Sequence, residues 1–198
     1  MAANKTNVVI LISGRGSNMK SIVNAINAGS LDVNVAAVIS NRPGAAGIEF
    51  AQKQGIQSLV VDHKNFDSRE QFDQTLAKEI DQFSPDIVVL AGFMRILTPE
   101  FVNHYAGKLI NIHPSLLPKF KGLNTHQRAI DAGEKEHGAS VHLVTPELDN
   151  GPVILQARVP VLQDDDASTL AARVLEQEHQ LYPDAINKLV TEKLTQTA

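Results

Sequence analysis

Short apolar runs alternate with amphipathic stretches along almost the whole chain, and this alternation constrains the fold more than any other feature. The apolar runs have the length of buried strands, and the amphipathic stretches have the length and period of helices. Strands that alternate with helices form a mostly parallel sheet with helices on both faces. The sequence therefore predicts a doubly wound, Rossmann-like α/β fold, and we expect residues 1–198 to form a single domain.

Seven strands and six helices are predicted from this pattern. The strands span residues 8–12, 33–40, 56–61, 87–90, 109–113, 140–144 and 153–159. The helices span residues 17–28, 45–54, 68–83, 99–105 and 125–131, with a last one from residue 168 that Pro183 would kink or split. The final two strands lie too close in sequence for a helical crossover, so part of the sheet near the C-terminus is expected to be antiparallel.

Composition disfavours several classes of function. The chain has no cysteine, which removes disulfides, thiolate catalysis and cysteine-based zinc sites. It has no apolar run long enough for a membrane span, and its first residues do not resemble a signal peptide. A net charge of −4 without a basic block disfavours nucleic-acid binding. We therefore expect a cytoplasmic protein with small-molecule substrates and no nucleic-acid or membrane partner.

A glycine-rich stretch, residues 13–18, follows the first predicted strand and opens the first predicted helix. Its glycines allow the backbone to approach a phosphate, and N–H groups at a helix start bind anions. The full G-x-G-x-x-G fingerprint is absent because position 19 is Met. The stretch therefore predicts a phosphate-binding loop, with a plain glycine-rich turn as the alternative.

Asn111 and His113 lie two residues apart at the end of a predicted buried strand, so their side chains share one face. An amide donor beside a possible acid or base favours a catalytic pair over a histidine that only satisfies a backbone group. No second ligand at helical spacing supports a metal at His113. Ser115 lacks the G-x-S-x-G context of a serine nucleophile.

Two acidic stretches have a structural and a functional interpretation. The loop at residues 147–152 places Asp149 between two predicted strands, where it either pairs with a histidine or only favours the turn. The run at residues 164–166 precedes the last helix, whose N-terminus favours negative charge. We interpret this run as a helix start and not as a metal site.

Together these stretches resemble the glycinamide ribonucleotide transformylases, over nearly the whole chain from residue 8 to about residue 183. The matching stretches are residues 12–18, 86–97, 109–118, 137–142 and 148–154. The Asn-x-His-Pro-Ser-Leu-Leu-Pro stretch is shared by several formyltetrahydrofolate enzymes, so it indicates the chemistry. The Gly-Ser-Asn start indicates the phosphorylated glycinamide.

The resemblance implies transfer of a formyl group to the amine of glycinamide ribonucleotide, a step of purine synthesis. The co-substrate would be 10-formyltetrahydrofolate, with no metal, and we expect a monomer or weak homodimer. The family's catalytic residues would be Asn111, His113 and Asp149. Its substrate contacts would be Gly16, Ser17 and Asn18 for the phosphate and Glu178 for the ribose. Its folate contacts would be Arg69, Met94, Arg95, Ile96, Leu97 and Asn111.

The implied mechanism is direct transfer through a tetrahedral intermediate. Asn111 and His113 would hydrogen-bond the developing oxyanion. Asp149 would orient His113 and favour its protonated form, and that proton could pass to the leaving folate nitrogen. The chain departs from the family pattern at Lys121 and Asn124, where Pro and His are frequent, and Asn150 replaces a frequent Gly.

Three rivals remain for this resemblance. Methionyl-tRNA formyltransferase would carry a further basic C-terminal domain, for which we expect no room in 198 residues. Formyltetrahydrofolate hydrolase would carry a further regulatory domain. A non-catalytic nucleotide-binding module would explain the glycine-rich stretch but not the pair Asn111 and His113.

Overall fold

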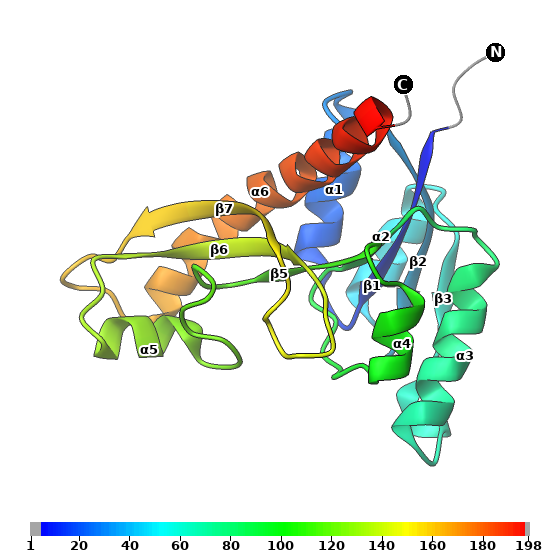
Figure 1. Ribbon diagram of the computed structural model, residues 1–198, viewed down its shortest axis with the longest axis horizontal. Helices are drawn as coiled ribbons and strands as arrows, with labels where there is room; N and C mark the ends of the chain where they lie inside the picture. The colour runs from blue at the N-terminus through cyan, green and yellow to red at the C-terminus, as the bar shows by residue number, and fades with distance from the viewer. Residues whose placement is uncertain (1–4, 197–198) are drawn as a thin grey trace. The chain divides into compact units, whose positions relative to one another are not determined.

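The computed structural model describes residues 5–196, with strands ordered β3-β2-β1-β4-β5-β6-β7 in one sheet (Figure 1). The chain divides into two compact units between Ile110 and Asn111, a boundary that falls within β5 (Leu109–His113). The predicted mixed α/β sheet is confirmed, including an antiparallel part toward the C-terminus. Each unit is described in turn, and the expectation of a single domain stays a prediction.

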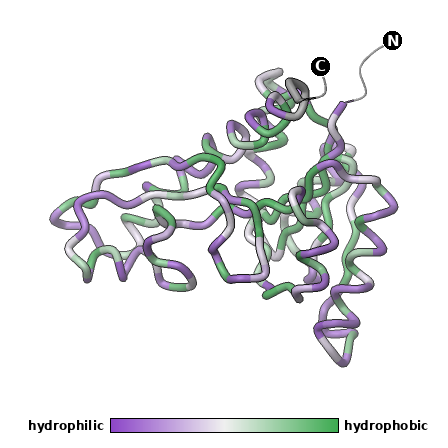
Figure 2. Tube along the Cα trace, in the orientation of Figure 1, coloured by the Kyte–Doolittle hydropathy of each residue, from purple (hydrophilic) through white to green (hydrophobic). Residues whose placement is uncertain are grey.

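The first unit is a parallel sheet built on β1 (Thr6–Ile12), which pairs with β2 (Val33–Ser40) on one side and β4 (Ile87–Leu90) on the other. β2 also pairs with β3 (Ser58–Val60). Residues 8–12 of β1 are fully buried, as expected for a central strand of a parallel sheet. Its other elements are α1 (Ser17–Asn27), α2 (Ala46–Lys53), the 3-10 turn η1 (His63–Asn65), α3 (Arg69–Asp81) and α4 (Pro99–His104). In Figure 2, α3 carries both hydrophilic and hydrophobic colours, as an amphipathic helix does.

The chain leaves β1 toward β2 on one side, while β4 pairs on the other side, so strand order reverses at β1. Ligands of open α/β sheets bind beyond the carboxyl ends of strands at such a switch point. The glycine-rich residues that follow β1 and the segment that follows β4 both lie there. The fold therefore places two of the predicted binding segments at the expected edge.

The second unit begins in β5 and contains α5 (Thr125–Asp131), β6 (Glu136–Leu143), β7 (Val153–Pro160) and α6 (Ala167–Gln196). β6 and β7 are antiparallel, as predicted, and α6 packs against both. The start of α6 matches the interpretation of the acidic run, because Asp166 accepts a 2.8 Å hydrogen bond from the Thr169 N–H. Asp165 pairs with Arg173 at 2.6 Å, which lowers the pKa of this carboxyl.

One predicted boundary in the second unit was wrong, and one of the two alternatives predicted at Pro183 is excluded. β6 begins at Glu136 and not at residue 140, because pairing with β7 extends back to the partners Glu136 and Pro160. α6 is not split at Pro183 but runs through it as one helix. Buried side chains on both sides of Pro183, including Tyr182 and Ile186, favour continuation of the helix. No helix within residues 5–196 has the length and apolar character to cross a membrane.

Candidate active site

The glycine loop, residues 13–18, leads from β1 into α1 in the first unit. Gly16 is the N-cap of α1 at φ 66°, a left-handed conformation that favours glycine. A Cβ atom at Gly16 would lie 2.9 Å from the Met19 side chain and 3.4 Å from the Gly47 backbone. The Gly47 N–H donates to the Gly14 carbonyl at 3.0 Å and so fastens the loop to α2. The loop's shape therefore requires glycine at position 16.

A pocket of about 240 Å³ lies against the glycine loop. Its lining includes the predicted phosphate residues Gly16, Ser17 and Asn18, together with Arg42 and Met94. The start of an α-helix favours an anion, and the guanidinium of Arg42 adds positive charge at the same pocket. The structure thus brings the three predicted phosphate residues together at one cavity.

The predicted folate segment, residues 94–97, follows β4 and is tied to the glycine loop. The Met94 N–H donates to the Ser13 hydroxyl at 2.7 Å, and that hydroxyl donates to the Asn41 side chain at 2.6 Å. Met94 and Ile96 are each 66% exposed, so this segment presents apolar side chains to solvent. Such side chains suit contact with a flat aromatic ring.

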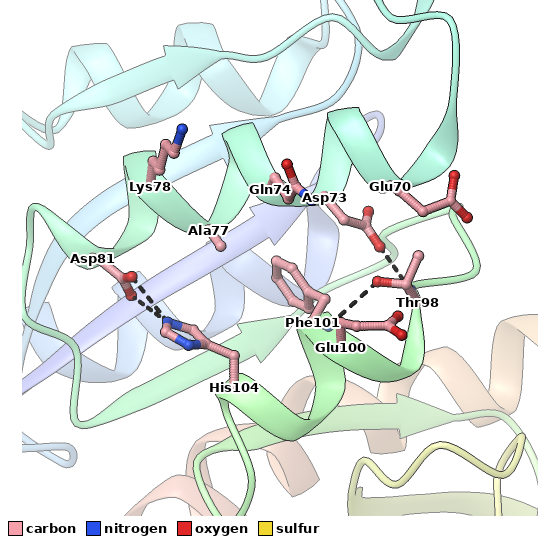
Figure 3. Close-up of a pocket in the computed structure, with 10 residues that line it drawn as sticks. All are labelled: Glu70, Asp73, Gln74, Ala77, Lys78, Asp81, Thr98, Glu100, Phe101 and His104. Atoms are coloured by element: carbon pink, nitrogen blue, oxygen red, sulfur yellow. Dashed lines mark hydrogen bonds and ion pairs between the residues drawn. The ribbon is translucent and has the colours of Figure 1, made fainter.

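Asp73 on α3 holds the far end of this segment and was not predicted from the sequence. Its carboxylate, 2% exposed, accepts a 2.6 Å hydrogen bond from the Thr98 N–H, and Figure 3 shows it directed at Thr98. Burial raises the pKa of Asp73, while Arg69 and Arg95 oppose this shift. Two predicted folate residues therefore lie within electrostatic reach of one buried carboxyl.

A second pocket of the first unit, about 560 Å³, lies between α3 and α4 (Figure 3). None of the predicted site residues lines it. Its lining includes the ion pair between Asp81 and His104, at 2.9 Å. The cavity shares Asp73 and Thr98 with the contact that holds the predicted folate segment.

The second unit brings the three predicted catalytic residues together. Nδ1 of His113 lies 3.4 Å from the Asp149 carboxylate, an ion pair when the ring is protonated, and both side chains are less than a tenth exposed. Nε2 of His113 donates to the Phe120 carbonyl at 2.9 Å. The Asn111 amide lies 3.4 Å from Nε2 of His142, which is itself 3.8 Å from Asp149. We call Asn111, His113, His142 and Asp149 the His–Asp cluster.

Asp149 is fixed from a neighbouring loop. It has φ 47°, which is uncommon outside glycine, and its carboxylate accepts a 2.9 Å hydrogen bond from the Gly122 N–H. The residues next to these two also meet, because the Lys121 ammonium donates to the Asn150 side chain. Lys121 and Asn150, two of the three positions at which the sequence analysis expects a departure from the family pattern, therefore contact each other beside Asp149.

Two further histidines of the second unit, His126 and His137, contact each other. His137 on β6 is 1% exposed, and its Nε2 lies 3.2 Å from Nδ1 of His126. Burial, together with the neighbouring His126, lowers the pKa of His137 to about 4. Burial and His113 also lower the pKa of His126. These rings are therefore neutral near pH 7.

Glu178, the predicted ribose contact, lies within α6 and is 8% exposed. Burial, and secondarily the charge of Glu178, raises the pKa of Tyr182. The structure thus places Glu178 beside the core of the second unit. Within residues 5–196, no three His, Cys, Asp or Glu side chains form a group that could hold a metal ion.

Comparison with known proteins identifies the family. The formyl transferase family model matches residues 6–186. A phosphoribosylglycinamide formyltransferase of Escherichia coli is 54% identical over 91% of this chain and 85% of its own length, and one of Haemophilus influenzae is 45% identical over 89% and 83%. The solved phosphoribosylglycinamide formyltransferase of Coxiella burnetii superposes with a TM-score of 0.88 at 50% identity, covering 93% of this chain and 86% of the other. The resemblance seen in the sequence is therefore confirmed, and the chain belongs to the formyl transferase family.

Proposed function

We propose that the chain transfers the formyl group of 10-formyltetrahydrofolate to the amine of glycinamide ribonucleotide. The products would be formylglycinamide ribonucleotide and tetrahydrofolate, in de novo purine synthesis. The observation that carries the proposal is the buried contact between His113 and Asp149, with Asn111 on the same strand as His113. Relatives named for this reaction, at about half identity over nearly their full length, support the choice of substrates.

Binding of the two substrates uses different parts of the chain. The glycine loop takes the phosphate of the ribonucleotide through Gly16, Ser17 and Asn18, and Glu178 takes the ribose. The folate is held by Asn111 and by the first unit. The first-unit residues are Arg69, Met94, Arg95, Ile96 and Leu97. The exposed apolar side chains of the segment after β4 and the pocket at the glycine loop support this division.

The chemistry is attack of the amine nitrogen on the formyl carbon, with the carbonyl electron pair moving to oxygen. Asn111 and His113 donate hydrogen bonds to this oxyanion. When the tetrahedral species collapses, the bond to the folate nitrogen breaks, and His113 gives a proton to that nitrogen. His113 then regains a proton from the nitrogen that attacked, so protons balance, and Asp149 stabilises the charged ring throughout.

One contact of the free protein bears on this mechanism. The Nε2–H of His113 donates to the Phe120 carbonyl, and Nδ1 faces Asp149, so neither ring nitrogen is open in the structure. In the reacting complex, the formyl oxygen replaces the Phe120 carbonyl oxygen as acceptor of the Nε2–H. Asp149 keeps its place on Nδ1 and fixes the ring.

The protein acts in the cytoplasm, as a monomer or weak homodimer, on small molecules. Net negative charge without a basic block supports the absence of a nucleic-acid substrate. No metal takes part, because proton transfer and hydrogen bonding within the His–Asp cluster suffice for formyl transfer to an amine.

The test is an assay of purified protein with both substrates, read by mass spectrometry of the ribonucleotide and by the absorbance change as tetrahydrofolate forms. We expect one formylated ribonucleotide for each tetrahydrofolate, and strong loss of both products in His113→Ala. Folded protein that gives no formylated ribonucleotide would contradict the proposal. Formylation of methionyl-tRNA in a parallel assay would replace it with the tRNA-directed rival.

A further inference from the structure

His142 is held in one tautomer by its own backbone. The side chain is 2% exposed on β6, and its Nδ1 lies 2.9 Å from the Leu143 carbonyl oxygen. A carbonyl oxygen only accepts hydrogen bonds, so Nδ1 must carry a proton. In the neutral ring the second nitrogen, Nε2, is then left with a lone pair and only accepts.

This fixed acceptor faces the amide of Asn111. The distance from Nε2 of His142 to Nδ2 of Asn111 is 3.4 Å. An asparagine side chain has two orientations related by a half-turn, one with NH2 toward a given neighbour and one with oxygen toward it. Because Nε2 only accepts, the NH2 group faces His142. This leaves the second N–H and the oxygen of Asn111 in defined directions.

We propose that neutral His142 is the positioning residue that aims the Asn111 amide for formyl transfer. The inference rests on the proposed function, because it gives Asn111 the role of hydrogen-bond donor to the oxyanion. His142 itself touches neither substrate in this scheme. It acts by excluding the amide orientation that would point an oxygen, instead of an N–H, at the developing negative charge.

The surroundings of His142 make this positioning sensitive to acid. The titratable groups that face it are Asp149, 3.8 Å away in the loop after β6, and His113 on β5; Asn111 is uncharged. Burial lowers the pKa of His142, although Leu143 and Asp149 oppose this and His113 reinforces it. A protonated His142 would donate to Asp149 and repel the Asn111 NH2 group. Acid would therefore turn the amide and draw Asp149 away from His113.

The first test compares His142→Leu, which removes the acceptor, with His142→Gln, whose amide oxygen can replace Nε2. His142→Leu should lower kcat by roughly tenfold or more, a part of the loss expected for an oxyanion donor, while both KM values change less than about twofold. His142→Gln should recover most of kcat. The acid limb of its pH–rate profile should lie at lower pH than in the wild type, because the side chain at position 142 no longer titrates. His137→Gln, which removes another buried histidine of β6, is the matched control and should leave the acid limb unchanged.

A second test separates this proposal from the proposed function. Asn111→Ala tests the function by itself, since full kcat in this variant would refute the role of Asn111. If Asn111→Ala is impaired, adding His142→Leu should cost almost nothing further. A full additional loss would show that His142 acts without Asn111 and would overturn the inference.

A spectroscopic test does not depend on activity. Long-range 1H–15N spectra of the free protein should show His142 with Nδ1 protonated and Nε2 bare at neutral pH. The side-chain NH2 resonances of Asn111 should shift on acidification in the wild type and stay in place in His142→Gln. If His142→Leu does not fold, this comparison still decides the matter. A protonated Nε2 at neutral pH, or Asn111 resonances that shift equally in both proteins, would refute the proposal.

Discussion

The glycine loop of the first unit and the His–Asp cluster of the second are built in different ways. The loop is shaped by backbone: a left-handed Gly16, an N–H from Gly47 and the start of a helix. The cluster is shaped by buried side chains whose ring nitrogens must carry protons in a particular pattern. A backbone site is insensitive to pH and is damaged by added volume, whereas a side-chain site is damaged by loss of one charge or one proton.

The largest expected effect is in the His–Asp cluster. Asp149→Asn keeps size but removes charge, so kcat should fall by roughly 10²-fold or more, while both KM values move much less. His113→Ala should be at least as damaging, and the double variant should be little worse than the worse single one. Steady-state kinetics of the four proteins measure this. Glu147→Gln, which removes an exposed charge of the same loop, is the control, and additive losses would mean that His113 and Asp149 do not act as a unit.

Damage to the glycine loop should appear in KM and not in kcat. Gly16→Val places a β-branched residue at φ 66° and a Cβ 2.9 Å from the Met19 side chain. The KM for the ribonucleotide should rise roughly tenfold, since left-handed strain of about 1–2 kcal/mol corresponds to about that factor. The KM for the folate should change little. Equal rises in both KM values would make the loop purely structural.

Stability should depend on acid through the second unit. His137 has a pKa of about 4 when folded against 6.5 for a free ring. The unfolded chain therefore takes up the proton first as pH falls, so the stabilisation is complete above pH 6.5 and is lost toward pH 4. Urea unfolding at pH 7.5 and pH 5 should show a smaller loss of stability in His137→Gln than in the wild type. The same loss in both proteins would show that other groups cause the acid sensitivity.

The smallest effect is expected at Asn124. This residue has φ 56° at the start of α5, and its amide does not titrate. Asn124→Ala strains the backbone and is expected to lower the rate, but the shape of the pH–rate profile should stay the same. Asn124→Gly, which tolerates a positive φ, should restore the rate. A profile that shifts by about a unit, the size of shift that an altered neighbouring charge produces, would mean that position 124 influences the titrating groups.

The local sequence pattern predicted most of the fold. The errors occurred where contacts between residues far apart in the sequence determine the structure. Strand boundaries at residues 33–40, 87–90 and 109–113 match, because continuous apolar runs mark them. The early start of β6 could not be seen, since Glu136, His137 and Gly138 lack an apolar pattern and are ordered by pairing with β7. Pro183 predicted a kink or a split of the last helix, and packing on both sides of it keeps the helix continuous.

Only part of the candidate site could be predicted from the sequence, for the same reason. Asn111 and His113 share a strand face through their spacing, but their neighbour His142 comes from another strand. The sequence signal for His142 was its place two residues after Ser140 in the predicted strand. Both residues are buried in the structure. Asp73 left a clearer signal, because it stands on the apolar face of α3 with Phe72 and Leu76. A carboxylate at such a position indicates a specific partner, which only the structure identifies as Thr98.

The contact between Lys121 and Asn150 has a consequence for how such chains diverge. The two side chains meet across the loops that hold Asp149. A change to either residue alone removes this exposed contact and leaves the other side chain to bond water, whereas a joint change replaces both partners together. Positions 121 and 150 should therefore be inherited as a pair, and a chimera that exchanges only one of the two loops should be less active than either parent.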